Sequence, residues 1–127
     1  MTYTQLIEDG KLKLADPLGN TVLTMEESLR DLHGQIALTG EITVEADHAF
    51  RDELLSAAIV CRELVLDFSG VTMLSSTALT SLLAVQHAIE TKPGGSLLLK
   101  GMSSPVFAVF RENGYDALFE IETGGAG

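Results

Sequence analysis

Short alternations of apolar and polar residues dominate the first quarter of the chain. Apolar pieces recur at residues 5–7, 12–14 and 21–24, and turn-forming residues separate them at positions 9–10 and 16–20. Period-two alternation between Gly, Pro, Asn and Asp clusters is typical of hairpin strands. The pattern therefore predicts antiparallel β-structure at the N-terminus.

From residue 34 onward, the pattern changes to strands that alternate with helices. The predicted strands are residues 34–40, 62–67, 96–100 and 118–121. The predicted helices are residues 46–59, entered through a cap at Thr43, residues 76–90, and a third helix with Ser104 as its cap, Pro105 in its first turn and its end at Gly114. The first helix has one apolar stripe at helical spacing, formed by Phe50, Leu54, Ala57 and Ala58. This order predicts an α/β fold, with helices packed on a mixed sheet that carries extra N-terminal hairpin strands.

The length of 127 residues fits one domain with a modest core. We expect residues 1–33 to form an N-terminal β extension of the same domain and residues 34–122 to form its body. The glycine-rich residues 123–127 are expected to be a flexible tail.

The charge pattern excludes several kinds of partner. The formal net charge is −10, and only eight Lys and Arg are scattered along the chain. Nucleic acids and anionic membrane surfaces require clustered basic residues, so neither is expected to bind. The N-terminus lacks a basic start and an apolar core, which predicts no secretion signal, and the lone Cys61 fits a reducing compartment. The expected location is the cytoplasm.

The most informative segment, residues 68–89, contains no Asp, Glu, Lys or Arg. Its many hydroxyls and its Gln and His argue against a membrane-spanning helix and against direct membrane insertion. We predict a loop over residues 68–75 followed by the second helix, whose outward face is small and neutral. That face comprises Thr77, Thr80, Ser81, Ala84 and His87. In an acidic protein, a surface without charge indicates a contact site.

Three hydroxyls, Ser75, Ser76 and Thr77, lie where this helix begins. Ser and Thr are favoured helix caps, and they are also kinase targets, so the residues alone leave both interpretations open. Met73 and Leu74 before them are either interface residues or core filling. Asp67 ends a predicted strand, where it either hydrogen-bonds nearby backbone or has a chemical role.

No catalytic or cofactor motif accompanies these residues. His33, His48 and His87 are too far apart in sequence to form a local metal pair, and none is placed as a base for Ser76. Gly94-Gly95 lacks the residues that follow a phosphate-binding loop. We expect no enzyme activity, no cofactor and no metal.

Several short sequence segments within residues 34–121 resemble the STAS domain family, which is typified by bacterial anti-sigma-factor antagonists. Leu38-Thr-Gly-Glu-Ile-Thr43 is similar to the opening strand and Gly-Glu-Leu-Asp turn of the family. Leu64-Val-Leu-Asp-Phe-Ser-Gly-Val71 is similar to its central strand and the loop that follows. Ser75-Ser-Thr-Ala-Leu79 falls where the family has Asp-Ser-Ser/Thr-Gly-Leu, and Ser103-Ser-Pro105 with Phe110 and Gly114 resembles a C-terminal helix.

The resemblance implies a phosphorylation switch. The family serine after the motif aspartate is phosphorylated by a partner kinase, and Ser76 takes that position, ahead of Ser75 and Thr77. The chain departs from the pattern by having Ser75 for the aspartate and Ala78 for the glycine. The leading hypothesis is a regulatory domain that binds an anti-sigma-factor kinase.

The resemblance implies a partner surface that runs from the end of the central strand along the second helix. Its expected members are Asp67, Met73, Leu74, Ser75, Ser76, Thr77, Thr80, Ala84 and His87. The altered motif also leaves an alternative open. STAS domains resemble cytoplasmic subunits of membrane transport assemblies, where the same surface docks on an ATPase.

Overall fold

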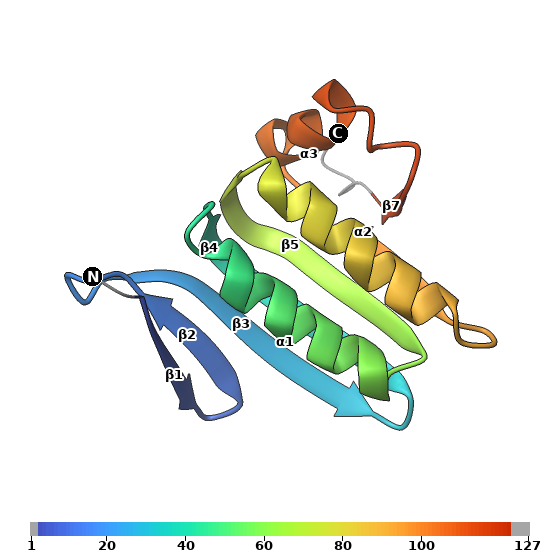
Figure 1. Cartoon of the computed structure of the whole chain (residues 1–127), viewed down its shortest axis with the longest axis horizontal. Helices are drawn as coiled ribbons and strands as arrows, with labels where there is room; N and C mark the ends of the chain where they lie inside the picture. The colour runs from blue at the N-terminus through green and yellow to red at the C-terminus, as the bar shows by residue number, and fades with distance from the viewer. Residues whose placement is uncertain (1–2, 123–127) are drawn as a thin grey trace.

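The computed structural model describes residues 3–122, which form one sheet and three helices (Figure 1). The strands are β1 (Thr4–Glu8), β2 (Lys11–Ala15), β3 (Thr21–Arg30), β4 (His33–Ile42), β5 (Glu63–Leu74), β6 (Ser96–Lys100) and β7 (Glu120–Glu122). The helices are α1 (Asp47–Val60), α2 (Thr77–Glu90) and α3 (Ser104–Glu112). The predicted flexible tail, residues 123–127, lies outside the described residues.

The sheet is mixed, as the sequence pattern predicts. Its strands lie in chain order from β1 to β7. The pairs from β1 to β4 are antiparallel, and the pairs from β4 to β7 are parallel. The parallel half follows from the helices between its strands, because a parallel pair needs a crossover connection. The N-terminal strands therefore belong to the same sheet as the α/β part.

Helices α1 and α2 lie side by side over one face of the sheet (Figure 1). The core fills the space between them and the sheet, where Phe50 of α1, Leu82 of α2 and Leu66 of β5 are fully buried. Burial alternates along β3 and β4, which is the period of two expected when a sheet buries one face. The expected apolar stripe of α1 is confirmed, since all four of its members are buried.

Helix α3 packs at the end of the sheet through aromatic rings. The ring of Phe110 meets the rings of Phe68 and Phe119 edge-to-face, with centroids 6.4 and 5.7 Å apart. Ser103, not Ser104, caps this helix, because the Ser103 hydroxyl accepts a hydrogen bond from the Val106 N–H at 3.4 Å. Sequence alone could not separate two adjacent serines before a proline.

The prediction of a loop over residues 68–75 is wrong, because strand β5 continues to Leu74. Phe68, Val71 and Leu74 are buried. The pairing with β4 also continues to Ile42, with register shifts after Ala37 and Gly40. These irregularities let a long strand bend and keep apolar side chains on the helix side. The last predicted strand is displaced as well, since β7 comprises Glu120–Glu122 rather than residues 118–121.

Candidate partner-binding site

The carboxyl ends of β4 and β5 meet at one edge of the sheet, directly before α2. The Ser75 N–H donates to the Ile42 carbonyl oxygen at 2.8 Å, so the end of β4 holds the residue that follows β5. Edges of this kind, where parallel strands end, are frequent ligand and partner sites in α/β proteins. The chain turns into α2 at this point.

The three hydroxyls predicted at the helix start differ in what they bind. Ser75 Oγ and Thr77 Oγ1 hydrogen-bond to one another at 2.9 Å. Ser76 occupies the N-cap position, yet it has helical backbone angles, and its side chain makes no capping hydrogen bond. Of the two interpretations that the sequence left open, the structure shows no capping bond by Ser76, and its exposed hydroxyl is available to another molecule.

The backbone at this end is only partly satisfied. The Ala78 N–H donates to the Ser75 carbonyl and the Leu79 N–H donates to the Ser76 carbonyl, both at 3.1 Å. The first N–H groups of a helix lack partners within it and carry the positive end of the helix dipole. No acidic residue lies in the first turn of α2 to occupy that end.

Apolar side chains flank the helix start. Met73 is 44% exposed at the end of β5, and Val44 is 61% exposed two residues beyond Ile42. Leu74 is buried, so its expected role in partner contact is replaced by core packing. Sequence reasoning missed Val44, although an isolated apolar residue between Thr43 and Glu45 was a signal for it.

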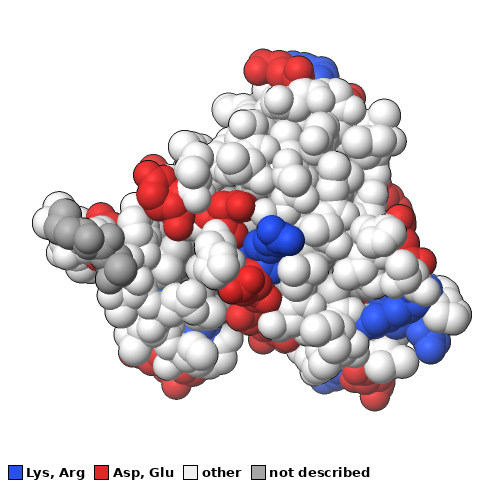
Figure 2. Space-filling model, in the orientation of Figure 1, with Lys and Arg blue, Asp and Glu red and all other residues white. Residues whose placement is uncertain are grey.

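The outward face of α2 is smaller than predicted. Thr77, Thr80 and His87 are exposed, whereas Ala84 is half-buried. Figure 2 shows an area without charge over α2, while acidic atoms gather beside α1. The expected neutral surface is thus present over the helix that Ser76 begins.

Ser81 was expected on this outward face, and this is wrong. Its side chain is buried, and its hydroxyl donates to Asp47 Oδ1 of α1 at 2.8 Å. Because α1 and α2 pack side by side, the small side of α2 faces a neighbouring helix instead of solvent. This bond connects the first turn of α1 to the second turn of α2.

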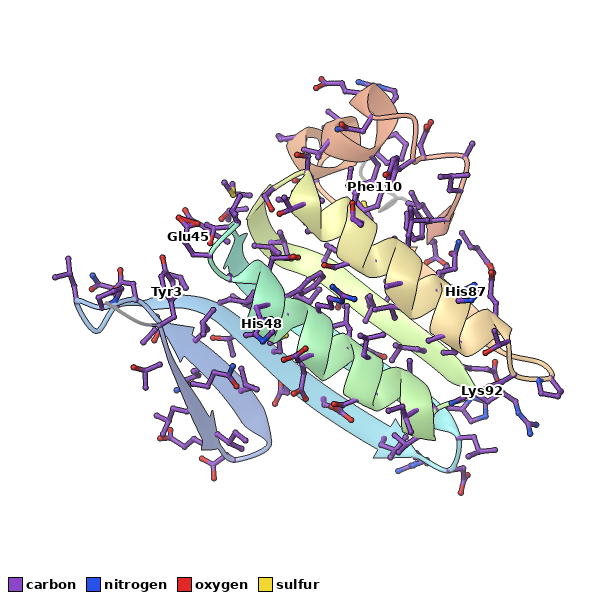
Figure 3. All side chains as sticks on the ribbon, in the orientation of Figure 1. Tyr3, Glu45, His48, His87, Lys92 and Phe110 are labelled. Atoms are coloured by element: carbon purple, nitrogen blue, oxygen red, sulfur yellow. The ribbon has the colours of Figure 1, made fainter. Side chains whose placement is uncertain are left out.

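Two of the predicted contact residues lie away from Ser76. Figure 3 shows His87 toward the C-terminal end of α2. His87 follows Ser76 by eleven residues, which corresponds to about 16 Å along a helix. Asp67 precedes Leu74 by seven residues, which is about 23 Å of extended strand. A partner seated on Ser76 reaches these residues only if it is large.

Asp67 has a local structural role. Its Oδ1 accepts hydrogen bonds from the Ser69 N–H at 2.9 Å and the Ser69 hydroxyl at 2.7 Å. Burial acts to raise the pKa of Asp67, but these bonds and the charge of Lys100 outweigh it and hold the pKa below its usual value. This is the backbone-bonding alternative that the sequence left open.

Two of the three histidines lie beside a single carboxylate each. His33 Nδ1 lies 3.0 Å from Glu63 Oε2, and His48 Nε2 lies 3.1 Å from Asp52 Oδ2, both on the surface. Within residues 3–122, no three His, Cys, Asp or Glu side chains gather in a way that would hold a metal. None of the three helices in that range is long and apolar enough to cross a membrane.

The order of strands and helices places the protein in the class of STAS-type α/β folds. The chain belongs to the STAS domain family, because the family model described as "Mlab, STAS domain" matches residues 25–120. A search of curated protein sequences gives no match.

Solved structures share this fold at low sequence identity. An anti-sigma factor antagonist from Mycobacterium paratuberculosis superposes with a TM-score of 0.70 and 20% identity, over 85% of this chain and 89% of that one. The anti-sigma factor antagonist SpoIIAA in its unphosphorylated form gives a TM-score of 0.68 and 17% identity, over 79% and 87%. The phosphorylated form of SpoIIAA, from Bacillus, is similar as well.

The same fold occurs inside a much longer chain. SLC26A9 gives a TM-score of 0.57 and 12% identity, and the match covers 98% of this chain but 22% of that one. At these identities the comparisons establish the fold.

Proposed function

We propose that this protein is a non-catalytic regulatory domain that binds a partner protein through the N-terminal end of α2. The proposed partner is an anti-sigma-factor serine kinase, and phosphorylation of Ser76 releases it. The observation that carries this proposal is the exposed Ser76 hydroxyl, which makes no capping bond although it begins a helix. A cytoplasmic location accompanies this role.

The proposed surface has the composition of a small protein interface. Met73 and Val44 offer exposed apolar contact area on either side of the helix start. Thr77 and Thr80 add hydroxyls that a partner can hydrogen-bond. Interfaces commonly combine a few apolar anchors with a polar rim and few charges at their centre. The uncharged segment over residues 68–89 meets that requirement.

The same geometry supports a switch. A phosphate on Ser76 would lie at the helix N-terminus, where backbone N–H groups and the dipole stabilise negative charge. The fold therefore tolerates the modification without rearrangement. The surface, however, gains roughly 1.5 to 2 negative charges and strong acceptors. A partner that buries a neutral surface would lose affinity, because the phosphate would be desolvated without a cation to pair with it.

Binding of the kinase to phosphate-mimicking and phosphate-blocking variants tests this proposal. We expect Ser76→Glu to weaken binding at least about tenfold, the equivalent of roughly 1.4 kcal/mol. Ser76→Ala should bind as the wild type does. Ser104→Glu is the matched control, because Ser104 is also an exposed serine in the first turn of a helix. Equal binding by Ser76→Glu and Ser76→Ala would refute the switch.

Intact-mass spectrometry of protein from native cells, with fragmentation to locate the site, tests the modification itself. A phosphate on Ser76 supports the kinase partner. Phosphate found only on Ser75 or Thr77 would move the acceptor by one residue. No phosphate under growth or stress would contradict the switch.

A second function is supported by the altered motif. Ser75 replaces the family aspartate beside the acceptor, and Ala78 replaces the glycine. The fold also forms part of a larger chain in SLC26A9. Both findings favour a domain that docks constitutively, as a cytoplasmic subunit of a transport assembly with an ATPase partner. Co-purification with an ATP-binding subunit, unaffected by Ser76→Ala and without phosphate, would favour this alternative.

A further inference from the structure

Among residues 3–122, strand β1 forms one edge of the sheet, and no other strand pairs with its outer side. It pairs with β2 alone, and all five of its residues are exposed. Leu6 is 54% exposed and Ile7 is 75% exposed, on opposite faces of the strand. In Figure 1 the β1–β2 hairpin stands at the side of the molecule away from α2 and α3. Its outer backbone groups are open to another strand.

The two edges of the described sheet differ in protection. Natural sheets blunt an edge with short strands, charged residues, proline or bulges, because an open edge pairs with other chains. β7 is three residues long, and two of them are glutamates. β1 has five residues, no proline, and a regular pairing with β2, and its single charge lies at its end. Only the β1 edge keeps the features of a pairing surface.

The charge distribution directs self-association to the same edge. The chain carries a net charge of −10, so two copies repel one another over most of their surface. The hairpin over residues 4–15 holds two acidic and two basic residues and is neutral. Lys13 Nζ lies 3.6 Å from Glu8 Oε1 and compensates the one charge of β1.

We propose that two copies of this chain pair through β1, antiparallel and about a two-fold axis at Leu6. Leu6 would face Leu6 of the second copy on one side of the joined sheet. On the other side, Ile7 would face Gln5 of the second copy and reach its Ile7 diagonally. Because the surface patch is the same on both copies, the assembly is closed at two.

The register follows from the strand itself. A two-fold axis at the middle residue pairs all five residues of β1, whereas an axis at any other residue leaves some unpaired. In this register Glu8 lies opposite Thr4, and the two Glu8 side chains are about 13 Å apart along the strands. That distance exceeds the screening length at physiological ionic strength, about 8 Å.

Sedimentation of the full chain over a concentration series tests the dimer. An interface this small is weak, so we expect a dissociation constant on the order of 100 µM. Leu6→Lys places two like charges opposite one another and should raise this constant at least about tenfold. Leu118→Lys is the matched control, because Leu118 is 50% exposed and lies near the other edge. A wild type that stays monomeric at about 1 mM, or equal effects of both variants, would overturn the proposal.

Cysteine crosslinking tests the register. Leu6→Cys should form an intermolecular disulfide under mild oxidation, because the two side chains face one another. Thr4→Cys should not, since the two Thr4 positions lie about 13 Å apart along the strands. The native Cys61 is buried and does not compete. Crosslinking by Thr4→Cys at the same rate as Leu6→Cys would overturn this register, and circular dichroism verifies that each variant is folded.

Discussion

The C-terminal end of α1 is held by a lysine from a distant loop, and this contact carries a quantitative prediction. Lys92 Nζ donates to the carbonyl oxygens of Ile59 at 2.7 Å, of Cys61 at 2.9 Å, and of Ala58. The last turn of α1 contains no basic residue of its own. Figure 3 shows Lys92 near this end of α1. One ammonium group thus satisfies three carbonyls that the helix leaves without partners.

The size of the effect follows from these contacts. Hydrogen bonds from a charged donor contribute about 1.5–3 kcal/mol each in net terms, and bonds that share one donor are not additive. Interaction of the charge with the helix dipole adds about 0.3–1 kcal/mol. Lys92→Met keeps most of the apolar stem and removes the donor. We expect it to lower the free energy of unfolding by about 3 kcal/mol, from a typical total of about 5–15 kcal/mol.

Urea denaturation followed by circular dichroism measures this loss. The midpoint should fall at an unchanged slope, and the melting temperature should fall by about 10 °C. Lys92→Arg should retain more than half of the stability that Lys92 contributes, because the guanidinium keeps the positive charge and the hydrogen-bond donors. Lys13→Met is the control, since its exposed ion pair with Glu8 contributes about 0–1 kcal/mol. If Lys92→Met loses no more stability than Lys13→Met, the capping role is refuted.

Two further predictions concern stability. Gly34→Ala should lower the free energy of unfolding by about 1–3 kcal/mol, because its Cβ would overlap Cys61 Sγ. Adding Cys61→Ala should restore part of the loss in chemical denaturation, and no restoration would exclude this clash as the cause. Burial, a hydrogen bond with Glu27 and the Glu27 charge raise the pKa of Glu53 from 4.5 to about 7. The folded state therefore binds the Glu53 proton more tightly than the unfolded state does. The protonated carboxyl thus contributes to the free energy of unfolding in full below pH 4.5, and this contribution is lost as the pH rises through about 7. Glu53→Gln should gain roughly 1 kcal/mol over the wild type between pH 5 and 8, after allowance for solvent screening. A difference between the two that stays constant with pH would contradict this assignment.

The element order was predictable because it depends on local periodicity. Each signal arises within a few residues of chain. These signals are the apolar–polar alternation in residues 4–24, the apolar stripe of α1, and the turn-forming proline and glycines at residues 93–95. Period two and period 3.6 decide which side chains share a face before any tertiary contact exists. The mixed sheet followed from this order and from the need for crossovers between parallel strands.

Two of the errors, the loop predicted after Asp67 and the exposed position predicted for Ser81, share one physical origin. The segment after Asp67 contains Ser69 and Gly70, which indicate a loop, yet it continues as β5 because β4 supplies backbone partners and the core buries Phe68 and Val71. Ser81 is polar, which indicates an exposed position, yet Asp47 of a neighbouring helix satisfies its hydroxyl. In each case a residue 30 or more positions away decided the outcome.

The candidate site divides in the same way. The sequence by itself determined that residues 68–89 carry no Asp, Glu, Lys or Arg, and that three hydroxyls precede a helix. Only the tertiary structure decided that the exposed Ser76 hydroxyl makes no capping bond, that Leu74 is buried, and that Val44 joins Met73 at the same edge. Composition and periodicity are properties of neighbouring residues, whereas exposure depends on what the rest of the chain packs against each side chain.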